Sequence, residues 1–198
     1  MINRTSAVFF CGLLATPGMA LAHSPVKGLD SFYNGMLHPV FVPAHMLLLI
    51  AIGLFIGQQG AKEQQLALVS FVVATIVGLA VAWFSFGIEI EIFVLGSAAL
   101  IGLLIATSPV VGIFWSSLVA VTAGFFLGAD STQEALLGKE KLFTLLGSGV
   151  AIYFLLLYPM ALADHFKKKE WHKIGIRVIG SWLAASALLV LSLSFVSK

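Results

Sequence analysis

The sequence predicts an all-α, polytopic membrane protein in which six transmembrane helices follow a cleaved signal peptide. Hydrophobic residues make up 60% of the 198 residues, whereas charged residues make up only 10%. A water-soluble domain of this size has too little interior to bury so much apolar surface, but the hydrocarbon core of a bilayer accommodates it. Six long apolar stretches and a short apolar segment at the N-terminus account for most of this composition.

Residues 1–22 have the parts of a secretory signal peptide. Arg4 provides a positive start, the apolar segment "SAVFFCGLLA" is too short for a comfortable span, and "TPGMALA" ends in small residues at the spacing of a cleavage site. Cleavage would remove Cys11, the only cysteine, and make His23 the new N-terminus. Residues 23–198 would then form one six-helix transmembrane domain. The alternative is that the segment stays uncleaved as a first helix.

The continuity of the six apolar stretches favours helices over barrel strands. Barrel strands alternate polar and apolar residues over about ten positions, whereas these stretches are apolar nearly throughout. A helix also satisfies the backbone hydrogen bonds of an isolated span in lipid. We expect spans at about residues 36–57, 66–86, 90–106, 109–127, 142–163 and 174–196.

The charges between the expected spans indicate the orientation. A cleaved signal peptide leaves the mature N-terminus in the periplasm, so residues 58–65 and 164–173 face the cytoplasm. The second of these loops reads "DHFKKKEWHK", and such lysine-rich loops are typical of the cytoplasmic side. The sequence therefore predicts a multi-pass protein of the bacterial inner membrane with a periplasmic N-terminus.

Two G-x-x-x-G motifs predict close contacts between helices. Gly53 and Gly57 lie in the first expected span, and Gly124 and Gly128 lie in the fourth. Glycines at this spacing let two helix backbones approach closely. Their placement would suit two inverted three-helix halves, although the same spacing also arises by chance in a glycine-rich chain.

Two histidines stand near the start of the first span, in "GMLHPVFVPAHMLLLIAIGLFIG". In a regular helix His38 and His45 would share a face but lie roughly 10 Å apart along the axis. That distance is too large for one metal ion, whose bonds to nitrogen are about 2 Å long. Pro39 and Pro43 disfavour helix in the residues before them, so a broken helix could join the two rings. The other interpretation is that both histidines bond to backbone or water at the membrane interface.

This stretch resembles the start of the HupE/UreJ family, small membrane proteins that are regarded as nickel or cobalt permeases. In that family a signal peptide precedes a first span that reads H-P-x-x-G-x-D-H and ends near A-V-G-L. His38, Pro39 and His45 match the motif, and "AIGLFIG" matches its end. Val42 stands in place of the glycine and Ala44 in place of the aspartate. The resemblance implies that the two histidines bind the transported metal.

A second family motif, H-G-x-A-H-G-x-E, aligns with "AGFFLGAD" at the end of the fourth span. Ala123 and Leu127 occupy the histidine positions, and Asp130 stands for the glutamate. The resemblance also implies a glutamate ligand near the third span, which Glu89 or Glu91 would supply. The alternative for these two glutamates is a solvated negative rim, which would still attract cations to the mouth of a pathway.

Other polar residues provide further candidates. After cleavage, His23 would offer both an amine and an imidazole, a pair that suits copper or nickel; the alternative is a terminus that begins with histidine by chance. Asp164 and His165 form either a cation exit site or simply a helix end before the lysines. The chain contains no nucleophile elbow, phosphate loop or HExxH motif, so we expect no enzymatic activity.

These observations predict a secondary permease that takes up nickel or cobalt from the periplasm, with no permanently bound cofactor. The expected partners are a divalent metal ion and the lipid bilayer, with self-association left open. No nucleic acid is expected, since the net charge is only +2. Two alternatives are a non-transporting accessory or assembly protein on the same scaffold and periplasmic copper capture by the N-terminal histidine. The expected metal-binding residues are His38, His45, His23, Glu89, Glu91 and Asp130.

Overall fold

The computed structural model describes residues 29–84, 89–132 and 136–196, and these residues form seven α-helices and no strand. The all-α prediction is therefore confirmed for this part of the chain. The predicted signal peptide and His23 lie outside the described residues. The helices are α2 (Ser31–Phe41), α3 (Pro43–Gln59), α4 (Gln65–Trp83), α5 (Glu91–Thr107), α6 (Ile113–Ala129), α7 (Gly138–Phe166) and α8 (Glu170–Val196).

The helices support the predicted spans only in part. The last five expected spans each correspond to one helix, α4 to α8, with ends that differ by a few residues. The first expected span, residues 36–57, takes the broken form that the prolines left open: it consists of α2 and α3, which meet at an angle of 74°. By length and composition α4, α7 and α8 can cross a membrane, and the bent pair would count as a fourth span. The apolar helices α5 and α6 have 17 residues each.

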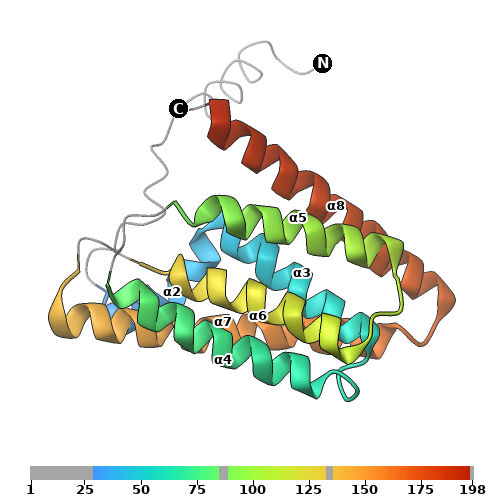
Figure 1. Ribbon diagram of the computed structural model, residues 1–198, viewed down its shortest axis with the longest axis horizontal. Coiled ribbons are helices and arrows are strands. Elements are labelled where there is room, and N and C mark those ends of the chain that lie inside the picture. The colour runs from blue at the N-terminus through green and yellow to red at the C-terminus, as the bar shows by residue number, and fades with distance from the viewer. Residues whose placement is uncertain (1–28, 85–88, 133–135, 197–198) are drawn as a thin grey trace, which may run out of the picture.

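The length of α5 and α6 explains why six spans are not established. Seventeen residues of helix extend about 25 Å, slightly less than the roughly 30 Å of a typical hydrocarbon core. Figure 1 shows that α3 to α8 run back and forth along the long axis of the molecule, each in the opposite direction to the one before. This alternation is the arrangement that consecutive membrane crossings would produce.

Helix α3 forms the centre of the bundle. It packs against α5, α7 and α8, and nearly all its side chains between Leu48 and Ile56 are fully buried. A helix that is apolar on every side is stable in such a position. The outer helices instead expose large apolar side chains, among them Phe114, Tyr158 and Trp182 at about 70%. Apolar residues in the interior and on the exterior together are what a bilayer environment permits.

Both G-x-x-x-G motifs lie at helix contacts, as the sequence predicted. A Cβ atom at Gly53 would lie 2.8 Å from the carbonyl oxygen of Leu156 in α7. A Cβ atom at Gly128 would lie 2.8 Å from the backbone nitrogen of Leu79 in α4. Only glycine therefore allows the backbones to approach this closely at these positions. The first motif joins α3 to α7, and the second joins α6 to α4.

Candidate metal site

The site is built around the break between α2 and α3. Val42, the residue at the break, has an extended backbone with φ −89° and ψ 108°, and Pro43 occupies the first turn of α3. Proline disfavours the helical conformation in the residue before it, whereas its own fixed φ suits the start of a helix. The sequence Val42-Pro43 therefore ends one helix and begins the next in a new direction.

The break brings the two histidines together. The ring centroids of His38 and His45 lie 5.1 Å apart, with the ring planes nearly perpendicular at 84°. The two residues are 3% and 0% exposed. This contact corresponds to the broken-helix alternative of the sequence analysis and not to two histidines in the wet interface.

A carboxylate from a third helix completes the group. Asp130, which follows the last residue of α6, places Oδ2 2.9 Å from Nε2 of His45. The aspartate side chain is only 12% exposed. Because a carboxylate oxygen only accepts hydrogen bonds, we assign the proton of the neutral His45 ring to Nε2, which donates to Asp130. A carboxylate partner of this kind fixes the tautomer and orientation of an imidazole.

The tautomer determines which atom of His45 remains available. With Nε2 bonded to Asp130, the lone pair is on Nδ1, which is buried and has no hydrogen-bond partner within the described residues. A buried polar atom without a partner is energetically costly. Its lone pair is also the group that binds a transition metal. The donor set therefore fits a metal ion in chemistry: a neutral imidazole with a carboxylate behind it and a second imidazole beside it.

Contacts between α2 and α7 hold the first histidine in place. Gly35 and Gly147 lie where a Cβ atom would collide with the backbone of the facing helix. Ser148 Oγ donates a hydrogen bond of 3.0 Å to the carbonyl of Gly35, and Thr144 Oγ1 donates one of 3.1 Å to the carbonyl of Ser31. These two hydrogen bonds fix α2 on α7.

The end of α6 is fixed equally well. The buried Ser131 donates a hydrogen bond of 2.8 Å to the carbonyl of Leu127. Thr132 donates one of 3.2 Å to the carbonyl of Ala82 at the end of α4. These bonds close the last turn of α6 and connect its end to α4, so Asp130, which immediately precedes Ser131, has a defined position.

Apolar residues occupy the positions where the family motifs have further ligands. Ala44, Ala123 and Leu127 are all 0% exposed and belong to the hydrophobic core. Within the described ranges, no group of three or more His, Cys, Asp or Glu residues has an arrangement that could hold a metal ion. The protein side of this candidate site is therefore a pair of imidazoles and a carboxylate bonded to one of them.

The other predicted site residues lie elsewhere. Glu89 and Glu91 are exposed at the start of α5, where Glu91 belongs to the first turn. They fit the alternative of a solvated negative rim. His23 is outside the described residues, so its part in metal binding stays a prediction.

The Asp164–His165 pair is a helix end. Asp164 accepts a 3.1 Å hydrogen bond from the backbone nitrogen of Ala61 and pairs with Lys167 at 2.8 Å. The exposed ring of His165 contacts that of Phe166. Asp164 therefore connects the end of α7 to the turn before α4, which corresponds to the second of the two interpretations given for this pair.

Nothing in the sequence alone pairs His45 with Asp130. The two residues are 85 positions apart, and helix periodicity says nothing about which helix ends meet. The available signal was that each residue occupies a position of a family motif. That signal suggests a common site but not a direct bond.

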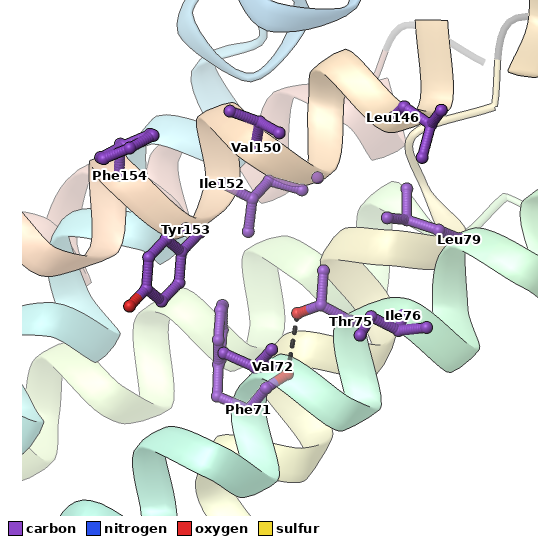
Figure 2. A pocket seen from close by; sticks show the side chains of 11 residues that line it. Phe71, Val72, Thr75, Ile76, Leu79, Leu146, Val150, Ile152, Tyr153 and Phe154 are labelled. Carbon is purple, nitrogen blue, oxygen red and sulfur yellow. Dashed lines mark hydrogen bonds between the residues drawn. The ribbon is translucent and has the colours of Figure 1, made fainter. Parts of the chain in front are cut away.

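The groove between α4 and α7 differs from the histidine site because its lining is apolar (Figure 2). It has a volume of about 350 Å³ and is lined mainly by aliphatic and aromatic side chains. The hydroxyl of Thr75 is bonded within its own helix, to the carbonyl of Phe71 at 2.9 Å. No histidine, carboxylate or lysine lines this groove, so it lacks groups that would bind an ion.

Comparison with known proteins agrees with the motifs. The family model described as HupE / UreJ protein matches residues 11–190. No curated protein and no solved structure matches the chain. The matched range includes the histidine pair, Asp130 and both glycine motifs, and it covers most of the chain. This chain is therefore a membrane protein that belongs to the HupE / UreJ protein family.

Proposed function

We propose that this protein carries nickel or cobalt ions across the bacterial inner membrane into the cytoplasm, as a secondary permease. Membership of the HupE / UreJ family supports a metal-related role in a membrane. The observation that carries the proposal is the buried contact between His38 and His45, with His45 bonded to Asp130. Imidazole is a suitable ligand for both metals.

The geometry suits an ion that binds and then leaves. Two metal–nitrogen bonds of about 2 Å each bring two imidazole rings close to the separation found here. With only two imidazoles from the described chain, water would keep the remaining coordination positions of the ion. Conduction requires a site strong enough to admit an ion and weak enough to release it, and an incomplete ligand set meets this requirement.

The membrane potential would drive the movement inward. A single charge gains about 2.3 kcal/mol on crossing 100 mV, so a divalent cation gains about 4.6 kcal/mol. The exposed Glu89 and Glu91 at the start of α5 would raise the local cation concentration at that end of the bundle. The chain has no phosphate-loop motif, and the proposal therefore requires no nucleotide.

Metal binding by the purified full chain tests the proposal. Nickel, cobalt, copper and zinc are titrated into the protein in detergent, and uptake of the bound metal is followed in proteoliposomes. We expect the protein to bind nickel or cobalt with a dissociation constant in the micromolar range or lower. The His38→Ala/His45→Ala variant should lose both binding and uptake. The matched control is His165→Ala/His172→Ala, which removes two imidazoles outside the site and should change neither.

Other outcomes would favour the alternatives. Copper binding that is lost only in His23→Ala would move the chemistry to the N-terminus. If neither the unmodified protein nor any variant binds metal, the accessory or assembly role is favoured. That second candidate is favoured by Ala44, Ala123 and Leu127, which replace expected ligands with buried apolar side chains.

A further inference from the structure

A polar pocket lies at the other end of the bundle from the histidine pair. Its lining residues come from the end of α3, the start of the α5–α6 connection and the α7–α8 turn, segments that Figure 1 shows at the same end of the bundle. Its volume is about 490 Å³. The residues that line it come from three segments distant in sequence: Gln58, Ser108, and Lys167, Lys168, Lys173 and Ile176 around the α7–α8 turn.

The lining of this pocket, which we call the lysine pocket, is strongly basic. Three of its six lining residues are lysines, and none is a carboxylate. Two carboxylates approach from outside the lining: Asp164 pairs with Lys167 at 2.8 Å, and Glu170 pairs with Lys173 at 2.7 Å. Lys168 forms no ion pair within the described residues. After these two ion pairs, the charge of Lys168 remains unbalanced, so the lysine pocket keeps a net positive charge.

Hydrogen bonds fix the part of the pocket wall that Gln58 and Ser108 form. Gln58 Nε2 donates to Ser108 Oγ at 2.9 Å and to the carbonyl of Ile105 at 3.3 Å. Because the oxygen of Ser108 accepts from Gln58, its own hydroxyl proton remains available as a donor. Arg177 Nε donates to the carbonyl of Ala106 at 2.8 Å and holds α8 against the end of α5. The lysine pocket thus combines a donor hydroxyl, three ammonium groups and a supported wall.

The surroundings indicate that lipid lies next to this pocket. Along α8, Trp171, Ile174 and Trp182 are 68%, 60% and 71% exposed. Tryptophan is enriched where a membrane meets water. The cytoplasmic leaflet carries anionic lipids, and basic pockets between transmembrane helices bind their headgroups. The lysine-rich end of this chain is also the end that the sequence places in the cytoplasm.

We propose that the lysine pocket is a binding site for a phosphate group, supplied by the headgroup of an anionic phospholipid. The phosphate would accept hydrogen bonds from the ammonium groups of Lys168 and Lys173 and from the hydroxyl of Ser108. Bound there, it would join α3, the α5–α6 connection and the start of α8. This proposal is independent of metal transport, because none of these residues belongs to the histidine site.

Native mass spectrometry of the full chain tests the site. The protein is presented with equal amounts of phosphatidylglycerol and phosphatidylcholine in detergent, and retained lipid is counted. We expect a roughly tenfold preference for the anionic lipid. Lys168→Gln/Lys173→Gln should reduce that preference to about unity, because two charges of the pocket are removed. The matched control is Lys62→Gln/Lys169→Gln, which removes two exposed lysines of the same end that do not line the pocket; it should keep the preference.

Addition of inorganic phosphate distinguishes the sources of the ligand. Retention of phosphatidylglycerol that persists in excess phosphate supports a lipid site. Displacement of the lipid by phosphate supports the same pocket with a free anion as its ligand. Equal retention of the two lipids by the unmodified chain, with no phosphate binding measured by calorimetry, would overturn the proposal. Equal losses in the pocket variant and the control would also overturn it, because general surface charge would then explain the preference.

Discussion

At the scale of single residues, the bond between His45 and Asp130 decides what the site can do. It orients one buried imidazole and leaves Nδ1 as its lone-pair atom. A histidine in the same place without the carboxylate would be free to adopt either tautomer. The other interpretation of the sequence, in which both histidines bond to backbone or water at the membrane interface, does not include a carboxylate 85 positions away.

Asp130→Asn tests this role. The amide removes the negative charge and weakens the orientation of His45, so nickel or cobalt affinity should fall about 10–100-fold, the usual effect of losing an outer partner of a metal ligand. The measurement is a calorimetric titration in detergent. Asp30→Asn is the matched control, because Asp30 caps α2 through a 2.8 Å bond to the backbone nitrogen of Ser31 and asparagine caps helices equally well. Unchanged affinity in Asp130→Asn would mean that the carboxylate is only structural.

At the scale of elements, the break at Val42 and the glycine contacts place the site. Because α2 and α3 meet at an angle of 74°, the rings of His38 and His45 are in contact although the residues are seven positions apart. The glycine motifs bring α3 onto α7 and α6 onto α4. In two inverted three-helix halves, the first, second and third spans correspond to the fourth, fifth and sixth. A contact between the first and fifth spans, α3 and α7, then requires a matching contact between the fourth and second spans, α6 and α4. The third and sixth spans, α5 and α8, pack directly on each other, a pair that the same exchange leaves unchanged.

Pro43→Ala tests the break. Without the proline ring, Val42 can adopt a helical conformation, so α2 and α3 can straighten and separate the two rings. We expect metal affinity to fall roughly tenfold or more, the size associated with a misoriented ligand, while circular dichroism shows that helical content is kept. Pro109→Ala, in the α5–α6 connection, is the control and should bind normally. Normal binding by both variants would show that the proline is not needed for the contact.

Gly35→Ala tests the packing of α2 on α7. The added methyl group would meet the backbone around Thr144, so the helices must move apart. Overpacking of this kind costs about 1–3 kcal/mol, which should appear as a lower unfolding temperature in detergent together with weaker metal binding. Gly96→Ala in α5 is the control, because a Cβ there meets nothing within 4 Å. Equal stability of the two variants would contradict the close contact.

At the scale of the whole molecule, charge and apolar surface give the two ends different roles. The histidine pair, Asp130 and the glutamates of α5 belong to one end, and the lysine pocket belongs to the other. In the predicted orientation, cations meet carboxylates and imidazoles on the periplasmic side. The same orientation puts the lysine pocket on the cytoplasmic side, as the positive-inside rule expects of a lysine-rich loop.

Cysteine labelling tests this orientation and the number of spans. Single variants Val110→Cys, Leu137→Cys and Lys168→Cys are made in a Cys11→Ala background and treated with an impermeant maleimide in intact spheroplasts. All three positions are exposed. Six alternating spans put Leu137 in the periplasm, where it should react, and put Val110 and Lys168 in the cytoplasm, where they should react only after lysis. Labelling of Val110 before lysis would show that α5 and α6 do not both cross the membrane.

The sequence by itself determined the class of the protein, its family and the approximate limits of its helices. Those features follow from local properties: apolar runs long enough for a bilayer, histidines beside prolines, and glycines at helical spacing. The tertiary structure alone decided that His38 touches His45, that Asp130 bonds to His45, and that Ala44, Ala123 and Leu127 are buried in the core. The physical reason is that these facts depend on which helix ends meet in space, and helix periodicity carries no information about that.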